Sequence, residues 1–128
     1  MNVNTLSKAE RLHSKTVIDQ MFTGGVSKSF SVFPLRVVYM SMPEQEVYSS
    51  ILISVSKKRF KRAVKRNRVK RQIREAYRKN KHELLRVLEA QGQPLAIAFI
   101  YLSDELIPSA MLEEKMKVLL ARMIEKTV

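Results

Sequence analysis

The stretch KKRFKRAVKRNRVKRQIREAYRKNK, residues 57–81, decides how the rest of this chain is arranged. It holds 14 of the chain's 24 Lys and Arg residues, but Glu75 is its only acid among the 12 Asp and Glu residues. The remainder carries slightly more acidic than basic groups, so the net charge of +12 comes from this stretch. Charge this concentrated indicates a polyanionic partner, because each phosphate neutralised by Lys or Arg releases condensed counterions.

The same stretch has the periodicity of a packed helix. Val69, Ile73 and Ala76 recur at helical spacing and predict one buried stripe. At ~100° per residue, the opposite side carries Asn67, Lys70, Arg71, Arg74 and Arg78. The pattern therefore predicts a helix that packs on one side and presents cations on the other. A merely solvated surface helix is the alternative, but such a face normally mixes both signs of charge.

The flanking sequence predicts one domain, residues 1–128, of mixed α/β (α+β) class. The predicted elements are a helix over 15–22, strands over 30–40 and 48–56, the basic helix, a strand over 95–102 and a final amphipathic helix after Pro108. A polar hairpin loop is expected between the first two strands. The third strand is apolar on both faces and should be central. The expected order is α-β-β-α-β-α, an α-β sandwich with about three to four strands.

Several classes of protein are disfavoured by composition. The chain has no cysteine, which excludes disulfides and thiolate metal sites and fits a reducing compartment. No apolar run resembles a signal peptide or reaches transmembrane length, so we expect a cytoplasmic protein without a membrane partner. The sequence places no matching Cys, Asp or His at ligand spacing from either His13 or His82, and the acids occur as surface pairs. We therefore expect no metal site and no catalytic residue in the protein itself.

The hexad RNRVKR, residues 66–71, carries a family resemblance. A run SVSKK, residues 54–58, precedes the hexad, and Arg74-Glu75 and Tyr77 follow it. This ordered set resembles the RNR motif of the bacterial ribonuclease P protein subunit. The opening of the chain is similar as well, with Arg11-Leu12 before a short helix and glycine after it.

The resemblance implies an α-β sandwich with an unusual left-handed β-α-β crossover through the basic helix, against the general right-handed preference. It implies the protein subunit of ribonuclease P, an endoribonuclease that removes the 5′ leader of precursor tRNA. In this family the RNA subunit holds the catalytic metals. The expected partners are the catalytic RNA and precursor tRNA, with a monomeric protein before assembly. Magnesium would be required by the ribonucleoprotein, with no cofactor bound and no nuclease activity in the protein alone.

The resemblance also implies two groups of site residues. The RNA-binding group is Lys57, Lys58, Arg62, Lys65, Arg66, Asn67, Arg68, Lys70, Arg71 and Arg74. The group expected to line a cleft for the leader is Ile18, Phe22, Arg36, Ser54 and Ser56. Two alternatives stay open, since Ile18 and Phe22 could be core residues and the two serines could simply face solvent.

Two features depart from the family pattern. Many members have glycine soon after the Lys-Lys pair, where this chain has Arg59-Phe60-Lys61-Arg62. Phe60 could stack on a base or anchor the start of the helix on the core, and we favour the anchor. Many members also place an aromatic residue in the first strand, where this chain offers Arg36, or Tyr39 in another register.

A second function class competes with this interpretation. A ribosomal-type structural RNA-binding protein without a role in cleavage would share the basic charge. It would not predict the arrangement of SVSKK before RNRVKR. A reader of duplex DNA would show helix-turn-helix spacing or a dimer element, and the sequence has neither.

Overall fold

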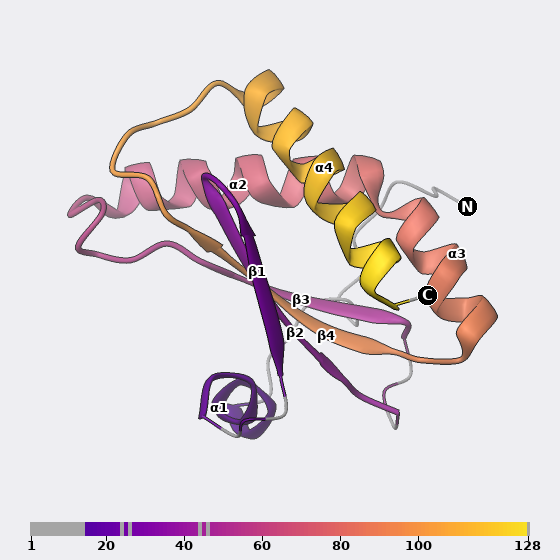
Figure 1. Ribbon diagram of the computed structural model, residues 1–128. Helices are drawn as coiled ribbons and strands as arrows, with labels where there is room; N and C mark the ends of the chain where they lie inside the picture. Colours follow the sequence, from indigo (N-terminus) through magenta and orange to yellow (C-terminus); the bar gives the residue numbers. More distant parts are fainter. Residues whose placement is uncertain (1–14, 24, 26, 44, 46, 128) are drawn as a thin grey trace.

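A computed structural model describes residues 15–23, 25, 27–43, 45 and 47–127, and the Arg11-Leu12 match lies outside them. One sheet has α1 on one face and the other three helices on the opposite face (Figure 1). The elements are α1 (Lys15–Thr23), β1 (Lys28–Val32), β2 (Leu35–Ser41), β3 (Ser49–Ser54), α2 (Ala63–Asn80), α3 (His82–Gln91), β4 (Leu95–Tyr101) and α4 (Ser109–Thr127). The mixed α/β fold class is confirmed.

The strand β4 is the centre of the sheet, as its two apolar faces predict. The strand order is β1-β2-β4-β3, with β4 antiparallel to β2 and parallel to β3. Every residue of β4 except Ile100 is buried. A strand that is apolar on both faces is stable only when it is covered on both sides, and here helices cover it from above and below.

The predicted strand over 30–40 is wrong, because it is two strands. Phe33 and Pro34 form the turn between β1 and β2, and Phe33 is 63% exposed. Pro34 has no N–H to give to a ladder, which fits a turn better than a strand. Because the residues on both sides of Phe33 and Pro34 are largely apolar, the sequence pattern did not reveal the turn.

The predicted hairpin between residues 40 and 48 is also wrong. β2 and β3 do not pair, because β4 lies between them. The basic helix α2 begins at Ala63, and the helical structure restarts after Lys81 as a separate α3. The observed order is therefore α-β-β-β-α-α-β-α.

The connection from β3 to β4 passes through α2 and α3, and the two strands are parallel neighbours. The basic helix therefore does lie in a β-α-β unit, as the resemblance implies. The left-handed sense of this crossover stays a prediction.

The main core fills the space between the sheet and the three helices above it. Its centre joins α2 to the sheet: the Tyr77 ring packs against Phe99 with 5.5 Å between ring centroids. The hydroxyl groups of Tyr77 and Ser49 form a buried hydrogen bond of 2.6 Å. A smaller cluster beneath α1 contains Met21 from the helix and Val38 from the sheet.

We expect Tyr77→Phe to lower the free energy of unfolding by about 1–3 kcal/mol, because the Ser49 hydroxyl would be left buried without its partner. Urea denaturation measures this change. Tyr48→Phe is the matched control, since that ring lies at the surface, and we expect it to alter stability by less than about 0.5 kcal/mol. Equal effects of the two changes would contradict a structural role for the Tyr77–Ser49 bond.

Candidate nucleic-acid interface

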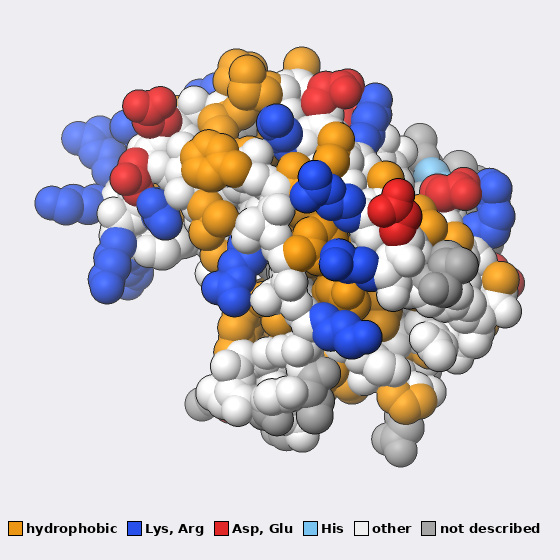
Figure 2. Space-filling model, viewed as in Figure 1, with side chains coloured by type: hydrophobic (Ala, Val, Ile, Leu, Met, Phe, Trp, Pro, Cys, Tyr) orange, Lys and Arg blue, Asp and Glu red, His pale blue; other side chains and the backbone are white. Residues whose placement is uncertain are grey.

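The helix α2 buries one stripe and exposes the rest. Val69, Ile73 and Ala76 are buried as predicted, and Tyr77 completes the stripe. Seven predicted RNA-binding residues are exposed, namely Lys57, Lys58, Arg62, Lys65, Asn67, Arg68 and Arg71. The other three are half-buried: Arg66, Lys70 and Arg74. Figure 2 shows Lys and Arg side chains gathered at the end of the molecule where α2 begins.

The two flanks of α2 have different neighbours. On one flank, Gln72 donates to the carbonyl of Ile107 and to Ser109 Oγ, both at 3.0 Å, which places that flank against the start of α4. The other flank carries Asn67, Lys70, Arg74 and Arg78 by helical geometry. Since α4 covers β1 and β2 while α2 packs on β3, this second flank lies at the β3 edge of the sheet. We call these four residues the outer stripe of α2.

Most cations of α2 have no acidic neighbour. No described carboxylate lies within 4.0 Å of Arg68, Lys70, Arg71 or Arg74. Two cations near the end of α2 do have acidic partners: Lys79 pairs with Glu113 of α4, and Arg78 Nε donates to Glu75 at 3.2 Å, a hydrogen bond that lowers the pKa of Glu75. Cations placed four residues apart repel by a few tenths of a kcal/mol, so an anionic ligand would stabilise this surface.

Arg66 has a structural task that the sequence interpretation missed. Its Nη1 donates to the carbonyl oxygens of Phe60 and Lys61, both at 2.8 Å, and so ties the turn before α2 to the helix. Phe60 itself is buried against Tyr101, with ring centroids 6.0 Å apart. The predicted anchor role of Phe60 is confirmed. The sequence did contain a signal for the task of Arg66. Phe60 is a lone aromatic residue among cations, and burying its ring requires a neighbouring side chain that holds the turn in place.

Ser56 also belongs to this turn. Its carbonyl oxygen accepts the N–H groups of Arg59 and Phe60, and its Oγ accepts the N–H of Lys58 at 2.9 Å. Ser56 is therefore more than a plain solvent-facing serine, because it holds the basic turn in shape. The exposed Lys57 and Lys58 project from this ordered turn.

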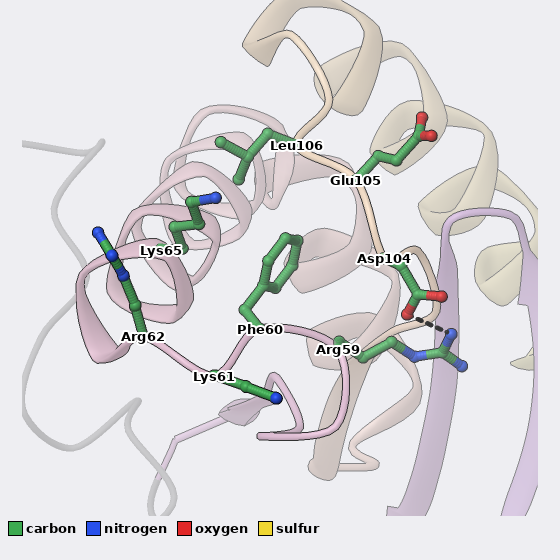
Figure 3. A pocket seen from close by; sticks show the side chains of 8 residues that line it. All are labelled: Arg59, Phe60, Lys61, Arg62, Lys65, Asp104, Glu105 and Leu106. Atoms are coloured by element: carbon green, nitrogen blue, oxygen red, sulfur yellow. Dashed lines mark hydrogen bonds and ion pairs between the residues drawn. The ribbon is translucent and has the colours of Figure 1, made fainter.

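An open cavity of about 500 Å³ lies where the turn meets the loop after β4 (Figure 3). The lining residues are Arg59, Phe60, Lys61, Arg62, Lys65, Asp104, Glu105 and Leu106. Arg59 and Asp104 form an ion pair of 3.1 Å across its margin. The lining thus carries basic side chains from the turn and the start of α2 and acidic ones from the loop, so the cavity has mixed charge, whereas the charged residues of the outer stripe are all cations.

The opposite face of the sheet brings together two of the predicted cleft residues. The strand registers place Arg36, Ile100 and Ser54 in one row across β2, β4 and β3, all on the side where α1 packs. Arg36 is exposed, and Ser54 is half-buried. α1 contacts the neighbouring rows through Met21, so the row with Arg36 forms a floor beside the helix.

Of the two predicted wall residues on α1, Phe22 is not a core residue. Its side chain is 47% exposed, whereas Met21 is buried in the cluster beneath the helix. Ile18 is half-buried and precedes Phe22 by one helical turn, so the two share a side of the helix. The alternative that Phe22 belongs to the core is wrong.

Two absences concern only the ranges that the structure describes. No three His, Cys, Asp or Glu side chains there lie close enough together to hold a metal ion. No helix in those ranges combines the length and apolar character of a membrane-spanning segment.

We expect Arg66→Gln to lower the free energy of unfolding by about 1–3 kcal/mol, because two charge-assisted bonds to the turn are removed. Arg68→Gln should change it by less than about 0.5 kcal/mol, since the Arg68 side chain is exposed and makes no ion pair with a described residue. Arg68→Gln should instead reduce the steepness of the plot of log K for RNA binding against log salt, with a change in slope of about 0.7–0.9. Urea denaturation and RNA titrations at several salt concentrations separate the two roles. An Arg66→Gln protein with the same free energy of unfolding as the parent would contradict the structural role of Arg66.

Truncating a buried phenylalanine to alanine lowers the free energy of unfolding by about 3–5 kcal/mol, and we expect Phe22→Ala to lower it by much less. Met21→Ala is the buried control, with an expected loss of about 2–5 kcal/mol. If Phe22 stacks on a leader base, its removal should reduce discrimination for leader-bearing tRNA by about tenfold, since stacking is worth about 1–3 kcal/mol. Thermal melting and tRNA affinity measure both effects. Unchanged discrimination would reject the wall role.

Comparison with known proteins agrees with this geometry. The family model described as Ribonuclease P matches residues 6–123. A ribonuclease P protein component of Porphyromonas gingivalis is 52% identical over 118 residues, covering 91% of this chain and 85% of the relative. One of Chlorobium phaeobacteroides is 34% identical, covering 80% and 75%. These relatives carry the ribonuclease P name, so the comparisons do not favour a ribosomal-type protein.

Solved structures agree with the sequence relatives. The ribonuclease P protein of Thermotoga maritima superposes with a TM-score of 0.68 at 26% identity, covering 88% of this chain and 96% of that one. The fold of the Staphylococcus aureus protein matches with a TM-score of 0.72, at 22% identity and with 91% and 96% covered. The fold, the basic helix and the family match lead to one conclusion. This chain belongs to the ribonuclease P protein family.

Proposed function

We propose that this chain is the protein component of ribonuclease P, in which it binds the catalytic RNA and the 5′ leader of precursor tRNA and assists removal of the leader. The observation that carries the proposal is the outer stripe of α2. This stripe and the neighbouring cations Arg68 and Arg71 offer a rigid, positively charged helix face. Such a face suits the phosphate backbone of a folded RNA.

The leader is assigned to the floor beside α1. Arg36 supplies one cation there, Ser54 supplies a small hydroxyl side chain, and Phe22 is exposed enough to stack on a base. A single strand of RNA needs this combination of backbone neutralisation and an aromatic surface. The floor and the outer stripe meet at β3, since Ser54 lies in that edge strand and α2 packs on it.

In this mechanism the protein positions RNA and does not cut it. The catalytic metal ions, expected to be magnesium, belong to the RNA subunit and supply the hydrolytic chemistry. The cations of α2 reduce repulsion between two polyanions, so the complex should form at a lower magnesium concentration. A cytoplasmic location and a monomeric protein before assembly are part of the proposal.

The test is cleavage of precursor tRNA at low magnesium with the ribonuclease P RNA alone, the protein alone and both together. We expect specific 5′ cleavage only where the RNA is present, with a lower magnesium requirement when the protein is added. The effect of the protein on the magnesium requirement should decrease as monovalent salt rises, because salt screens the cations.

The matched control is the variant Arg68→Gln, Arg71→Gln, Arg74→Gln, which removes three cations without touching the buried stripe. It should fold and yet lower the magnesium requirement less than the parent protein does. Specific cleavage by nuclease-free protein without RNA, abolished on changing a protein carboxylate, would overturn the proposal. So would a failure of the parent protein to alter cleavage by the RNA.

A further inference from the structure

A second cationic face lies on α4, away from the surface assigned above. Met111, Lys115, Val118, Arg122 and Lys126 follow one another at steps of four or three residues, so they line one side of the helix. All five are exposed, and Met111 and Val118 are among the large apolar side chains that are left open to solvent. Figure 2 shows Lys and Arg side chains in a column over α4, with apolar side chains between them.

The acids of α4 do not neutralise this face. Glu113 pairs with Lys79 of α2 and with Lys117, and Glu114 pairs with Lys117. Glu125 flanks the face but forms no ion pair with any described residue. No described carboxylate lies within 4.0 Å of the three cations on the face: Lys115, Arg122 and Lys126.

The face continues onto the edge strand β1. Lys126 Nζ lies 5.3 Å from the centroid of the Phe30 ring, which fixes the end of the cationic column against β1. A cavity of about 210 Å³ opens there, with Lys28 and Lys126 in its lining. The other lining residues include Tyr39, Ser41, Gln93 and Thr127, which supply polar groups. We call the five residues of α4 together with Lys28 the α4–β1 surface.

This surface lies on the other flank of the molecule from the outer stripe of α2. β1 and β3 are the two edge strands of the sheet, and three strand spacings separate them by roughly 14 Å. α4 contacts β1 and β2, whereas α2 contacts β3. One straight RNA helix docked along the outer stripe of α2 therefore leaves the α4–β1 surface uncovered.

We propose that the α4–β1 surface is a second RNA-binding region, which takes the phosphate backbone of a further segment of the ribonuclease P RNA. The proposal rests on the function proposed above. Charge complementarity identifies the occupant, because four cations without an acidic partner among the described residues match phosphates and not a protein surface of mixed charge. The cavity between Lys28 and Lys126 is smaller than a typical drug-sized pocket, but its two cations and polar lining suit a phosphate group. Met111 and Val118 offer apolar contact to the sugars.

The test uses three variants of the full chain. The α4 variant is Lys115→Gln, Arg122→Gln, Lys126→Gln. The matched control is Lys117→Gln, on the same helix, whose cation is already paired with Glu113 and Glu114. The reference variant is Arg68→Gln, Arg71→Gln, Arg74→Gln on α2. Thermal melting first establishes that each variant folds, and affinity for the catalytic RNA is then measured across a series of salt concentrations.

We expect the α4 variant to bind the catalytic RNA at least tenfold more weakly at low salt. The slope of log K against log salt should fall by about 0.7–0.9 for each phosphate that the variant no longer neutralises. The Lys117→Gln control should leave both quantities unchanged. An unrelated RNA of equal length should show a much smaller decrease in affinity than the catalytic RNA.

Several outcomes would overturn the inference. If only the α2 variant weakens binding, the proposed function stands and the second RNA-binding region does not exist. If neither variant weakens binding, the proposed function fails together with the inference. An equal decrease for the unrelated RNA would mean general electrostatic attraction without a defined binding region. Parental RNA affinity in the α4 variant, together with weaker binding to another protein, would assign the surface to a protein partner.

Discussion

The burial of one stripe of α2 against the sheet is the interaction on which the rest of this structure depends. Val69, Ile73 and Tyr77 are fully buried, and each large apolar side chain contributes about 1.5–3 kcal/mol on burial. Repulsion between cations at i,i+4 costs only a few tenths of a kcal/mol per pair. Burial therefore outweighs repulsion, and the protein can keep a strongly cationic helix folded before any RNA binds.

The connection into α2 gives this cationic helix a fixed position. β3 is parallel to the central strand β4, so the chain must cross from one end of the sheet to the other before β4 begins. The turn at the end of β3 is held by Phe60, which packs against Tyr101, and by the two bonds from Arg66. The residues between SVSKK and RNRVKR thus set the angle at which α2 leaves the sheet. The order of the two motifs has a structural reason as well as a functional one.

Periodicity predicted the elements whose burial follows from their own sequence. α2 and α4 each carry one apolar stripe, and β4 is apolar on both faces, so their existence and the central place of β4 followed directly. The β1–β2 hairpin did not follow, because Phe33 and Pro34 interrupt an apolar run without the glycine or asparagine that usually marks a turn. The pairing of β3 with β4 depends on long-range contacts that no local pattern encodes. Arg66 was missed as a structural residue because its partners are backbone carbonyls, those of Phe60 and Lys61, and the position of Phe60 as a lone aromatic residue among cations was the signal that could have indicated them.

The most direct test of the account uses the absence of cysteine from the chain. Single variants Asn67→Cys, Ser54→Cys and Glu89→Cys can each carry an iron chelate that cleaves nearby RNA in the assembled ribonucleoprotein with precursor tRNA. The account predicts cuts in the catalytic RNA from residue 67 on the outer stripe and cuts in the 5′ leader from residue 54 beside β4. Residue 89, exposed on α3, should give only weak cuts. Strong cuts from residue 89 and none from residue 67 would contradict the claim that α2 is the face that binds the catalytic RNA.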